Sequence, residues 1–234
     1  MRQSADTSET RVPATFMLHS LRPSFHRLVA HRWQLEVFGE QRVPTTGPVI
    51  FAANHIGWLD GPLLAIVSPR PAHVLTKREM YKGPMSIFLS KSGQIPLNRV
   101  DLDLQAIRDA AAVLHNGGAI GIFPEGVRGG GDVQHAKGGA AYLALRTGAK
   151  VVPVGILGTR APGAAKGYIP PRGTRIAMGF GDPLFLPPLP WPRKQEAVAE
   201  VTDRIRQAMI ATVAETQTLT GLELPGPLTE VEDE

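Results

Sequence analysis

The chain contains no cysteine, which excludes a disulfide, a cysteine nucleophile and a thiolate metal site within its 234 residues. It also lacks a run of roughly 18 apolar residues, so the sequence predicts no helix that crosses a bilayer. The first ten residues have no apolar stretch of the kind found in signal peptides, and we expect a cytoplasmic protein. Hydrophobic residues make up 43% and charged residues 20% of the chain, which indicates a globular protein rather than a disordered one.

Acidic residues are scarce in most of the chain and crowded at its end. Residues 222–234 hold five of the 21 acids and no Lys or Arg, although the net charge is +4. Residues 1–221 therefore carry 25 cations against 16 acids, a net charge of +9. A basic body favours an anionic partner, such as a phosphorylated small molecule, an anionic membrane surface or a nucleic acid. The alternative is a basic surface that only keeps the protein soluble.

The sequence divides into four parts, of which the first, residues 1–12, is expected to be disordered. Residues 13–42 are expected to form an amphipathic helical segment, because aromatic and aliphatic side chains recur beside Arg and His at about helical spacing. Pro23 interrupts this pattern, which favours one or two short helices. The segment is typical of a membrane-contact helix, and a helix packed on the protein's own core is the alternative. Residues 43–221 would form the main domain and residues 222–234 an acidic disordered tail.

From residue 48 onward, segments typical of strands and helices alternate. The expected strands are residues 48–53, 73–76, 119–123, 151–156 and 175–180. The expected helices are residues 62–67, 84–89, 103–116, 139–147 and 193–216. Short apolar runs predict the strands, and helical periodicity closed by glycine predicts the clearest helices. This alternation predicts an α/β fold with a central, mostly parallel sheet flanked by helices.

The stretch from Asn54 to Asp60 follows the first of these strands and offers the best candidates for chemistry. The imidazole of His55 can take a proton near pH 7, and a carboxylate on its other nitrogen fixes the tautomer and stabilises the imidazolium. Residues five apart on a helix lie roughly 140° apart around its axis, so the pair can meet only if the chain turns. Gly57 is a permissive position for that turn. Alternatively, Asp60 is only a helix N-cap and His55 only a hydrogen-bonded residue.

Two further loops carry groups suited to a phosphorylated alcohol. Residues 93–99 combine Gly and Pro, which fix a turn, with Arg99, whose guanidinium suits bidentate phosphate binding. Residues 123–128 follow another predicted strand, and there Glu125 can accept hydrogen bonds from hydroxyls while Arg128 can hold a phosphate. Taken singly, each loop is equally consistent with an ordinary surface turn.

In this order the stretches resemble the four blocks of the glycerolipid acyltransferase family, which includes the bacterial 1-acyl-glycerol-3-phosphate acyltransferases. The four stretches are Asn54-His55 with Asp60, residues 93–99, residues 123–128 and residues 151–156. The resemblance covers about residues 48–180. It implies a glycerol-3-phosphate acyltransferase-like α/β core and an N-terminal helical segment in contact with the membrane.

The resemblance also implies a role for each matching residue. His55 would be the general base for the acceptor hydroxyl and Asp60 its orienting partner, with no covalent acyl-enzyme. The acceptor would be bound by Arg99, Glu125, Gly126, Arg128 and Lys137. The acyl donor would be acyl-CoA or acyl carrier protein, and the acceptor would be 1-acyl-glycerol 3-phosphate in phospholipid biosynthesis. No metal or other cofactor is expected.

Three residues depart from the common family pattern and leave other acceptors open. Gly57 and Gly129 stand where serine is frequent, and Val127 stands where threonine is usual. Loss of hydroxyl groups beside the acceptor bears on which alcohol is acylated, not on the type of reaction. Another lysophospholipid or a mannosylated lipid is therefore the alternative acceptor.

Rival functions come from other classes. A metal-centred hydrolase could use His55, Asp60 and Glu125, but no second histidine lies at ligand spacing near them. A protein of this fold could also bind lipid without acylating it. Nucleic-acid binding is disfavoured because the basic residues are not interleaved with aromatics on a recognisable module. The expected partners are an acyl donor, a lysophospholipid and an anionic membrane, with the protein peripheral on the inner face of the cell membrane.

Overall fold

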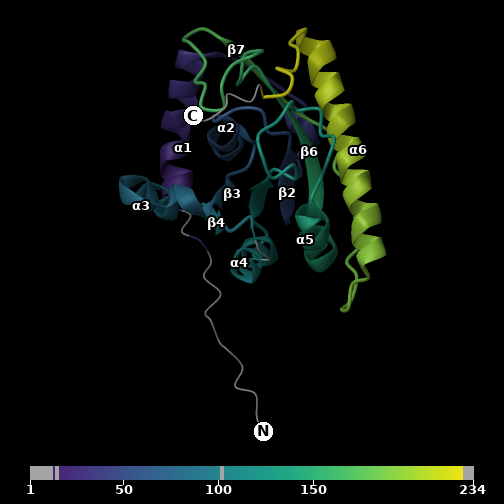
Figure 1. Ribbon diagram of the computed structural model, residues 1–234. Helices are drawn as coiled ribbons and strands as arrows, with labels where there is room; N and C mark the ends of the chain where they lie inside the picture. Colours follow the sequence, from purple (N-terminus) through teal and green to yellow (C-terminus); the bar gives the residue numbers. More distant parts are fainter. Residues whose placement is uncertain (1–12, 14–15, 101–102, 229–234) are drawn as a thin grey trace.

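The fold was determined as a computed structural model, which describes residues 13, 16–100 and 103–228. A seven-stranded sheet has the order β1-β7-β6-β2-β5-β3-β4 (Figure 1). Its strands are β1 (Gln34–Phe38), β2 (Val49–Ala53), β3 (Ala72–Lys77), β4 (Ile95–Leu97), β5 (Ala119–Ile122), β6 (Lys150–Leu157) and β7 (Arg175–Phe180). All neighbouring strands run parallel except β6 and β7, which are antiparallel. The predicted mostly parallel α/β sheet is confirmed.

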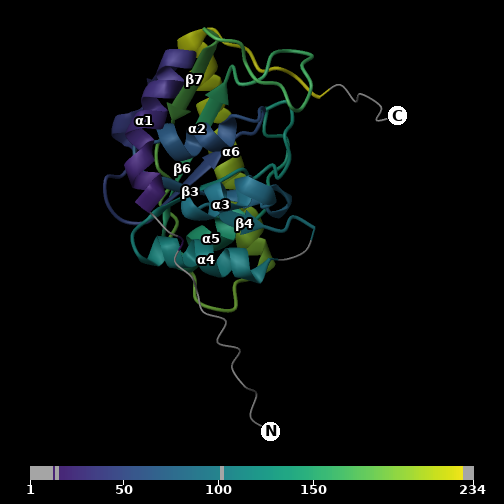
Figure 2. The ribbon, with the colours of Figure 1, turned by 90° about the vertical axis from the view of Figure 1, so that its left-hand side faces the viewer.

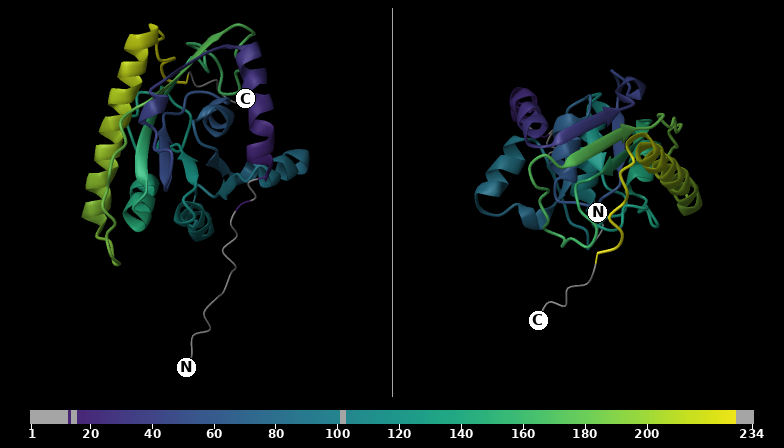
Figure 3. Two further views of the ribbon diagram at one scale, coloured as in Figure 1. Left: turned by 180° about the vertical axis from the view of Figure 1, so that it is seen from behind. Right: turned by 90° about the horizontal axis from the view of Figure 1, so that it is seen from above.

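Helices cover both faces of the sheet. They are α1 (Phe16–Arg32), α2 (Asp60–Val67), α3 (Gly83–Lys91), α4 (Leu104–His115), α5 (Gly139–Thr147) and α6 (Gln195–Thr220), with short 3₁₀ turns at Glu40–Arg42 and Arg78–Met80. α1 and α2 share a core with one face, and α4, α5 and α6 share a core with the other (Figure 3). α3 packs beside α1 (Figure 2). Within the described part of the chain, no helix is both long and apolar enough to cross a membrane.

Strand β2 lies at the centre of the sheet because both of its faces are apolar. Val49, Phe51 and Ala53 pack in the core with α1 and α2. Ile50 and Ala52 pack in the core with α4, α5 and α6, and all five side chains are fully buried. Burying a large apolar side chain contributes about 1.5–3 kcal/mol, so this strand is firmly held. The residues that follow Ala53 are therefore delivered to a fixed place at the edge of the sheet.

The N-terminal helix differs from the prediction of one or two short helices. α1 continues through Pro23, because Leu18 and Val29 are buried on either side of this exposed proline. The proline removes one backbone hydrogen bond, a cost of about 3 kcal/mol that packing at both ends of the helix offsets. Of the residues expected to be disordered, 1–12, none is among those described.

The helical segment expected over residues 13–42 also ends early, at Arg32. Residues 34–38 form β1, which pairs with β7, so the sheet begins before residue 43. Leu35 and Val37 pack against the core and alternate with Gln34 and Glu36, and a period of two is that of a strand. The aromatic and aliphatic residues of this stretch are therefore sheet residues rather than part of an interfacial helix.

The C-terminal segment differs from the expected disordered tail over its described residues, 222–228. Leu222 and Leu224 pack against a small buried cluster of Leu157, Ala177 and Val213. The carbonyl of Gly226 accepts a hydrogen bond of 2.6 Å from Arg160. The acids that suggested disorder lie mostly beyond these residues, at 230–234, which are outside the described part of the chain.

Candidate active site

The candidate site lies where three neighbouring parallel strands end. The order β6-β2-β5 at the centre of the sheet places the residues after these strands side by side. His55 follows β2, Glu125 follows β5, and Thr159 and Arg160 follow β6. Ligands of open α/β sheets bind outside the carboxyl ends of the strands. Three segments that are far apart in the sequence thus converge where a ligand is expected.

The chain turns sharply after β2 and brings His55 onto Asp60. Nδ1 of His55 lies 2.8 Å from Oδ2 of Asp60. The same oxygen accepts hydrogen bonds from the backbone N–H groups of Ile56 (2.7 Å) and Gly57 (2.8 Å). Asp60 begins α2, whose N-cap is Leu59, so its carboxylate serves the turn before the helix. The alternative that Asp60 is only an N-cap is therefore wrong.

The second oxygen of Asp60 is held by Thr159, a residue that the sequence reading did not single out. Thr159 Oγ1 donates to Asp60 Oδ1 at 2.5 Å, and both residues are fully buried. A Cβ on Gly57 would lie 2.6 Å from the same hydroxyl oxygen. Gly57 has no left-handed φ, so glycine is needed for this close approach and not, as expected, for the turn itself. Thr159 occupies the space that a side chain at position 57 would need.

The ring of His55 is held by Asp60 and Phe123, and its backbone by two further hydrogen bonds, yet the side chain remains accessible. It stacks on Phe123 with the ring centroids 4.2 Å apart, and its side chain is 19% exposed. The backbone N–H donates to Glu125 Oε1 at 2.8 Å, and the backbone carbonyl accepts from Gly129 at 2.9 Å. With Nδ1 directed at Asp60, the neutral ring carries its proton there and Nε2 is the basic nitrogen. This is the arrangement of a general base.

Glu125 accepts a hydrogen bond from the turn after β2 and is also a candidate ligand for the acceptor. The pKa of its carboxyl is raised to about 7, chiefly by burial; the hydrogen bond from the His55 N–H lowers this pKa, and the nearby carboxylates of Asp132 and Asp60 raise it. Near neutral pH the group therefore exists in both protonation states. In the ionised state it accepts from a substrate hydroxyl, and in the neutral state it can also donate.

Two of the cations predicted to bind the acceptor, Arg99 and Lys137, lie against Gly126. Arg99 donates from Nη1 to the Gly126 carbonyl at 2.7 Å. A Cβ on Gly126 would lie 2.9 Å from Cε and 3.1 Å from Nζ of Lys137, and the φ of this glycine is 73°. The backbone N–H of Lys137 donates to Pro124 at 2.8 Å, which fixes the lysine beside the loop. The structure thus places Arg99 and Lys137 on the loop that carries Glu125.

Arg128 lies beside the same loop. Its Nη1 donates to the carbonyl of Lys166 at 2.6 Å. Burial lowers the pKa of its guanidinium, while the carboxylate of Asp60 raises it and the charge of Arg99 lowers it. Arg128 is therefore within electrostatic reach of both Asp60 and Arg99. The structure brings together all the residues that the sequence assigned to the site.

Arg160 is a second site residue that the sequence reading missed. It is 2% exposed, and its Nε donates to the carbonyl of Ile56 at 2.9 Å. Its Nη2 donates to Gly129 (2.9 Å) and Gly226 (2.6 Å). Burial lowers the pKa of Arg160, and the nearby carboxylate of Asp60 raises it. The guanidinium of Arg160 thus bonds three segments: the turn after β2, the glycine loop of residues 129–131 and the C-terminal segment of residues 222–228.

Asn54 anchors the start of the turn. Its buried amide donates to the carbonyl of Ile156 at 3.0 Å and accepts from the N–H of the same residue at 2.7 Å. The contact ties the end of β2 to the end of β6. Thr159 and Arg160 could have been suspected by the rule that singled out His55, since they are polar residues directly after a buried strand.

The metal-centred alternative needs a cluster of ligands. Among the described residues, no three or more His, Cys, Asp or Glu side chains are grouped so that they could hold a metal ion. Asp60 already receives contacts from His55, Ile56, Gly57 and Thr159. Its oxygens are therefore committed to the protein.

Comparison with known proteins finds a matching family and similar chains. The family model described as Acyltransferase matches residues 34–157. The 1-acyl-sn-glycerol-3-phosphate acyltransferase of Bacillus subtilis (strain 168) is 25% identical over 182 residues, which are 77% of this chain and 88% of that protein. The lyso-ornithine lipid O-acyltransferase of Pseudomonas aeruginosa is 30% identical over 186 residues, which are 73% of this chain and 71% of that protein.

Another relative, the 1-acyl-sn-glycerol-3-phosphate acyltransferase of Borreliella burgdorferi, is 35% identical over 132 residues, 53% of this chain. The chain spans only 51% of the length of that relative. The crystal structure of the 1-acyl-sn-glycerophosphate acyltransferase PlsC from Thermotoga maritima superposes with a TM-score of 0.62 at 22% identity, covering 83% of this chain and 78% of that one. The two proteins share the fold.

Proposed function

The chain belongs to the acyltransferase family, whose model matches its residues 34–157, and we propose that it acylates 1-acyl-glycerol 3-phosphate. A fatty acyl group passes from a thioester, acyl-CoA or acyl carrier protein, to the free hydroxyl of the acceptor. The observation that carries the proposal is the 2.8 Å contact between His55 Nδ1 and Asp60 Oδ2 at the end of β2. Supporting it are the cations gathered on the neighbouring loops.

The reaction is a direct transfer in which His55 acts as the base. Nε2 takes the proton of the acceptor hydroxyl as the oxygen attacks the thioester carbonyl carbon. The tetrahedral intermediate then expels the thiolate by breaking the C–S bond, and the imidazolium returns the proton to the sulfur. Asp60 stabilises the imidazolium between these steps. General-base catalysis of this kind contributes about 10²–10⁴-fold in rate.

Arg99, Arg128 and Lys137 hold the phosphate of the acceptor. Each arginine uses one nitrogen to bind a backbone carbonyl, which fixes the plane of the guanidinium while its other N–H groups remain for the ligand. The one free hydroxyl gives its proton to His55, so Glu125, fixed by the N–H of His55, donates in its protonated state to an oxygen of the glycerol part of the acceptor. Holding the acceptor against the thioester in this way supplies several kcal/mol of the barrier reduction.

A second acceptor class is favoured by one observation, the similarity to a lyso-ornithine lipid O-acyltransferase over 71% of that protein. Transfer from palmitoyl-CoA to a panel of acceptors separates the two classes. The panel contains glycerol 3-phosphate, 1-acyl-glycerol 3-phosphate, other lysophospholipids, a lyso-ornithine lipid and a mannosylated phosphoinositide. Preference for 1-acyl-glycerol 3-phosphate supports the proposal, and preference for a phosphate-free acceptor overturns the assigned role of the cations.

The same assay tests the rival functions. Activity that is lost with a chelator and restored by a divalent ion indicates a metal-centred hydrolase. Binding of lipid with no transfer from either acyl-CoA or acyl carrier protein indicates a protein that only binds lipid. Transfer that chelators do not affect and that needs a thioester supports the proposal.

Both substrates are amphiphiles, and we place the enzyme on the inner face of the cell membrane. α1 supports this location, because none of its 17 residues is acidic and it carries exposed apolar residues as well as basic ones. The exposed apolar side chains of this helix are Phe16, Leu21 and Leu28. A helix with this composition binds an anionic lipid surface through both the hydrophobic effect and its charge.

A further inference from the structure

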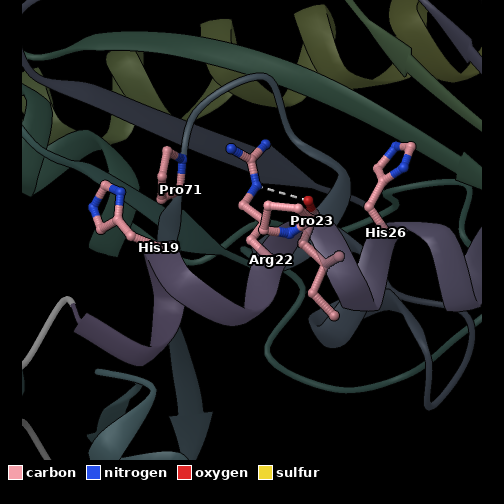
Figure 4. Close-up of a pocket in the computed structure, with 6 residues that line it drawn as sticks. His19, Arg22, Pro23, His26 and Pro71 are labelled. Carbon is pink, nitrogen blue, oxygen red and sulfur yellow. Dashed lines mark hydrogen bonds between the residues drawn. The ribbon is translucent and has the colours of Figure 1, made fainter.

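A cavity of about 210 Å³ lies between α1 and the segment that joins α2 to β3 (Figure 4). It is lined by His19, Arg22, Pro23, His26, Ile66 and Pro71, and is called here the α1 pocket. Asp60 begins α2, whereas Ile66 lies in its last turn, so the pocket is at the far end of this helix from the catalytic pair. The rise between the two residues is about 9 Å. The pocket is therefore separate from the candidate active site.

The α1 pocket holds a positive charge that no described carboxylate neutralises. Arg22 is half-buried, and its Nε donates to the carbonyl of Ile66 at 2.8 Å. Burial lowers the pKa of its guanidinium, with no acidic group opposing the shift. Within the described residues, neither Arg22 nor the two histidines form an ion pair. In Figure 4 the imidazoles of His19 and His26 lie on either side of the guanidinium and point away from it, with Pro71 between His19 and Arg22.

The bond to Ile66 explains only part of this arrangement. It satisfies a carbonyl at the end of α2, where the helix dipole places about half a negative charge. The guanidinium offers five N–H donors and this bond uses one of them, so most of its capacity and at least half of its charge remain. Arg22 is only half-buried, and within the described residues its other N–H groups bond no protein acceptor, so they remain open to a ligand. The pocket is therefore suited to an anionic ligand.

The geometry of the pocket selects a phosphate group. His19, Arg22 and His26 lie at positions i, i+3 and i+7 of α1 and so share one face of the helix. The planar guanidinium suits two phosphate oxygens, and a neutral imidazole offers one N–H donor. The volume is below the roughly 300–1,000 Å³ of sites that enclose drug-sized ligands. A small anionic head fits, and the rest of the ligand must remain outside.

The surroundings of the α1 pocket indicate the chemistry of the part of the ligand that remains outside it. α1 exposes Phe16 (79%), one turn before His19, and Leu28 (59%) on another face of the helix, and the adjacent α3 exposes Ile87 (60%). The two helices meet through an edge-on contact between Phe25 and Phe88. Like α1, α3 contains no acid, and it ends in Lys91. Apolar side chains among unopposed cations are the complement of an anionic bilayer.

We propose that the α1 pocket binds the phosphate group of an anionic membrane phospholipid that is not the substrate. One lipid headgroup bound by Arg22, with His19 and His26 on either side of it along α1, positions the helix on the bilayer. The acceptor is bound at the separate site after β2 and β5. The proposal rests on the membrane location given under the proposed function. It does not depend on the acyl-transfer chemistry.

The experiment measures binding of the full-length protein to phosphatidylcholine vesicles with and without phosphatidylglycerol. Arg22→Gln removes the pocket charge, and Arg27→Gln is the matched control, since Arg27 is an exposed arginine of the same helix outside the pocket. An arginine that acts only through general attraction contributes about 1 kcal/mol, or about fivefold in affinity. We expect at least a tenfold loss for Arg22→Gln and no more than fivefold for Arg27→Gln. Equal losses overturn the proposal.

A second variant covers the case in which Arg22→Gln fails to fold, which circular dichroism detects. His19→Asn with His26→Asn leaves Arg22 and its bond to Ile66 in place. We expect this variant to lose preference for phosphatidylglycerol vesicles as well, and full retention overturns the pocket as the site.

Two further arms identify the source of the phosphate and separate this proposal from the enzymatic one. Saturable thermal stabilisation by glycerol 3-phosphate without vesicles, lost in Arg22→Gln and accompanied by no vesicle difference, overturns the lipid assignment in favour of a soluble phosphate. His55→Ala lacks the proposed base and should bind vesicles as the wild type does. Failure of acyl transfer in the wild type therefore sinks the proposed function and leaves the vesicle result standing.

Discussion

Asp60 accepts more hydrogen bonds than its position at a helix start requires. Its two oxygens contact His55, Ile56, Gly57 and Thr159, and the carboxylate is fully buried. The pair of His55 and Asp60 could be predicted, because residue types and spacing are local properties of the sequence. Thr159 could not, since 99 residues separate it from Asp60 and only the pairing of β2 with β6 brings them together.

Replacing Thr159 by valine tests whether the hydroxyl positions Asp60. A hydrogen bond to a charged group is worth about 1.5–3 kcal/mol, so the loss should lower kcat by roughly tenfold or more. Because Thr159 contacts Asp60 rather than the acceptor, KM for the acceptor should change little. Steady-state kinetics measure both constants. Thr159→Ser keeps the hydroxyl and should restore most of kcat, and a valine variant as active as the wild type contradicts the positioning role.

Glu125 should make the stability of the protein fall as the pH rises. Burial raises the pKa of its carboxyl from 4.5 to about 7 in the folded protein, so the folded state binds more protons than the unfolded state between these values. The free energy of unfolding therefore decreases through this interval and levels off above it. Glu125→Gln keeps an oxygen for the N–H of His55 but cannot ionise.

The measurement is urea denaturation of the wild type and Glu125→Gln over this pH range. The wild type should lose stability relative to the variant between about pH 4.5 and pH 7, with no further relative change at higher pH. Parallel curves for the two proteins would show that the carboxyl is not perturbed by burial.

At the scale of elements, contacts between the loops around the site fix these loops in place. The glycine loop of residues 129–131 lies between the turn after β2 and the C-terminal segment. A Cβ on Gly131, whose φ is 85°, would lie 2.9 Å from Leu224 Cδ2. Arg160 bonds the carbonyls of Gly129 and Gly226. Glycine serves close packing here, and a run of glycines alone does not distinguish this use from mobility.

Two truncations test whether the C-terminal segment is part of the site. Removing residues 222–234 deletes Leu222, Leu224 and the carbonyl of Gly226, and we expect most of the activity to be lost. Loss of about 2 kcal/mol of apolar burial should lower Tm by about 4–8 °C in a domain of this size. Removing only residues 229–234 is the matched control and should leave Tm and kcat close to the wild type. Equal behaviour of the two truncations contradicts a structural role for the segment.

At the scale of the whole molecule, the sequence predicts the architecture better than the order of the strands. The alternation of apolar runs and helical periods after residue 48 was enough for a mostly parallel α/β fold. β1 was missed because none of its five side chains is fully buried, so its residues resemble the end of the helix before them. β4 was missed because it has three residues and contains Pro96, which a strand tolerates only at an edge of the sheet. The antiparallel pairing of β6 and β7 depends on long-range contacts that no local pattern records.

The site residues likewise come together only through the order of the strands in the whole sheet. His55, Glu125 and Thr159 come from three segments, and the order β6-β2-β5 makes them neighbours. Residues in the loops could be assigned to the site from the resemblance of their motifs. Arg160, which bonds backbone carbonyls only, carries no motif of that kind and became visible through the fold.

The central claim is that His55 removes the proton from the acceptor hydroxyl. The most direct test is the rate of CoA release from palmitoyl-CoA with 1-acyl-glycerol 3-phosphate, measured for the wild type and His55→Ala. The account predicts a fall of about 10²–10⁴-fold in kcat, with circular dichroism and Tm unchanged because the imidazole is partly exposed. Turnover of His55→Ala within tenfold of the wild type would contradict the claim.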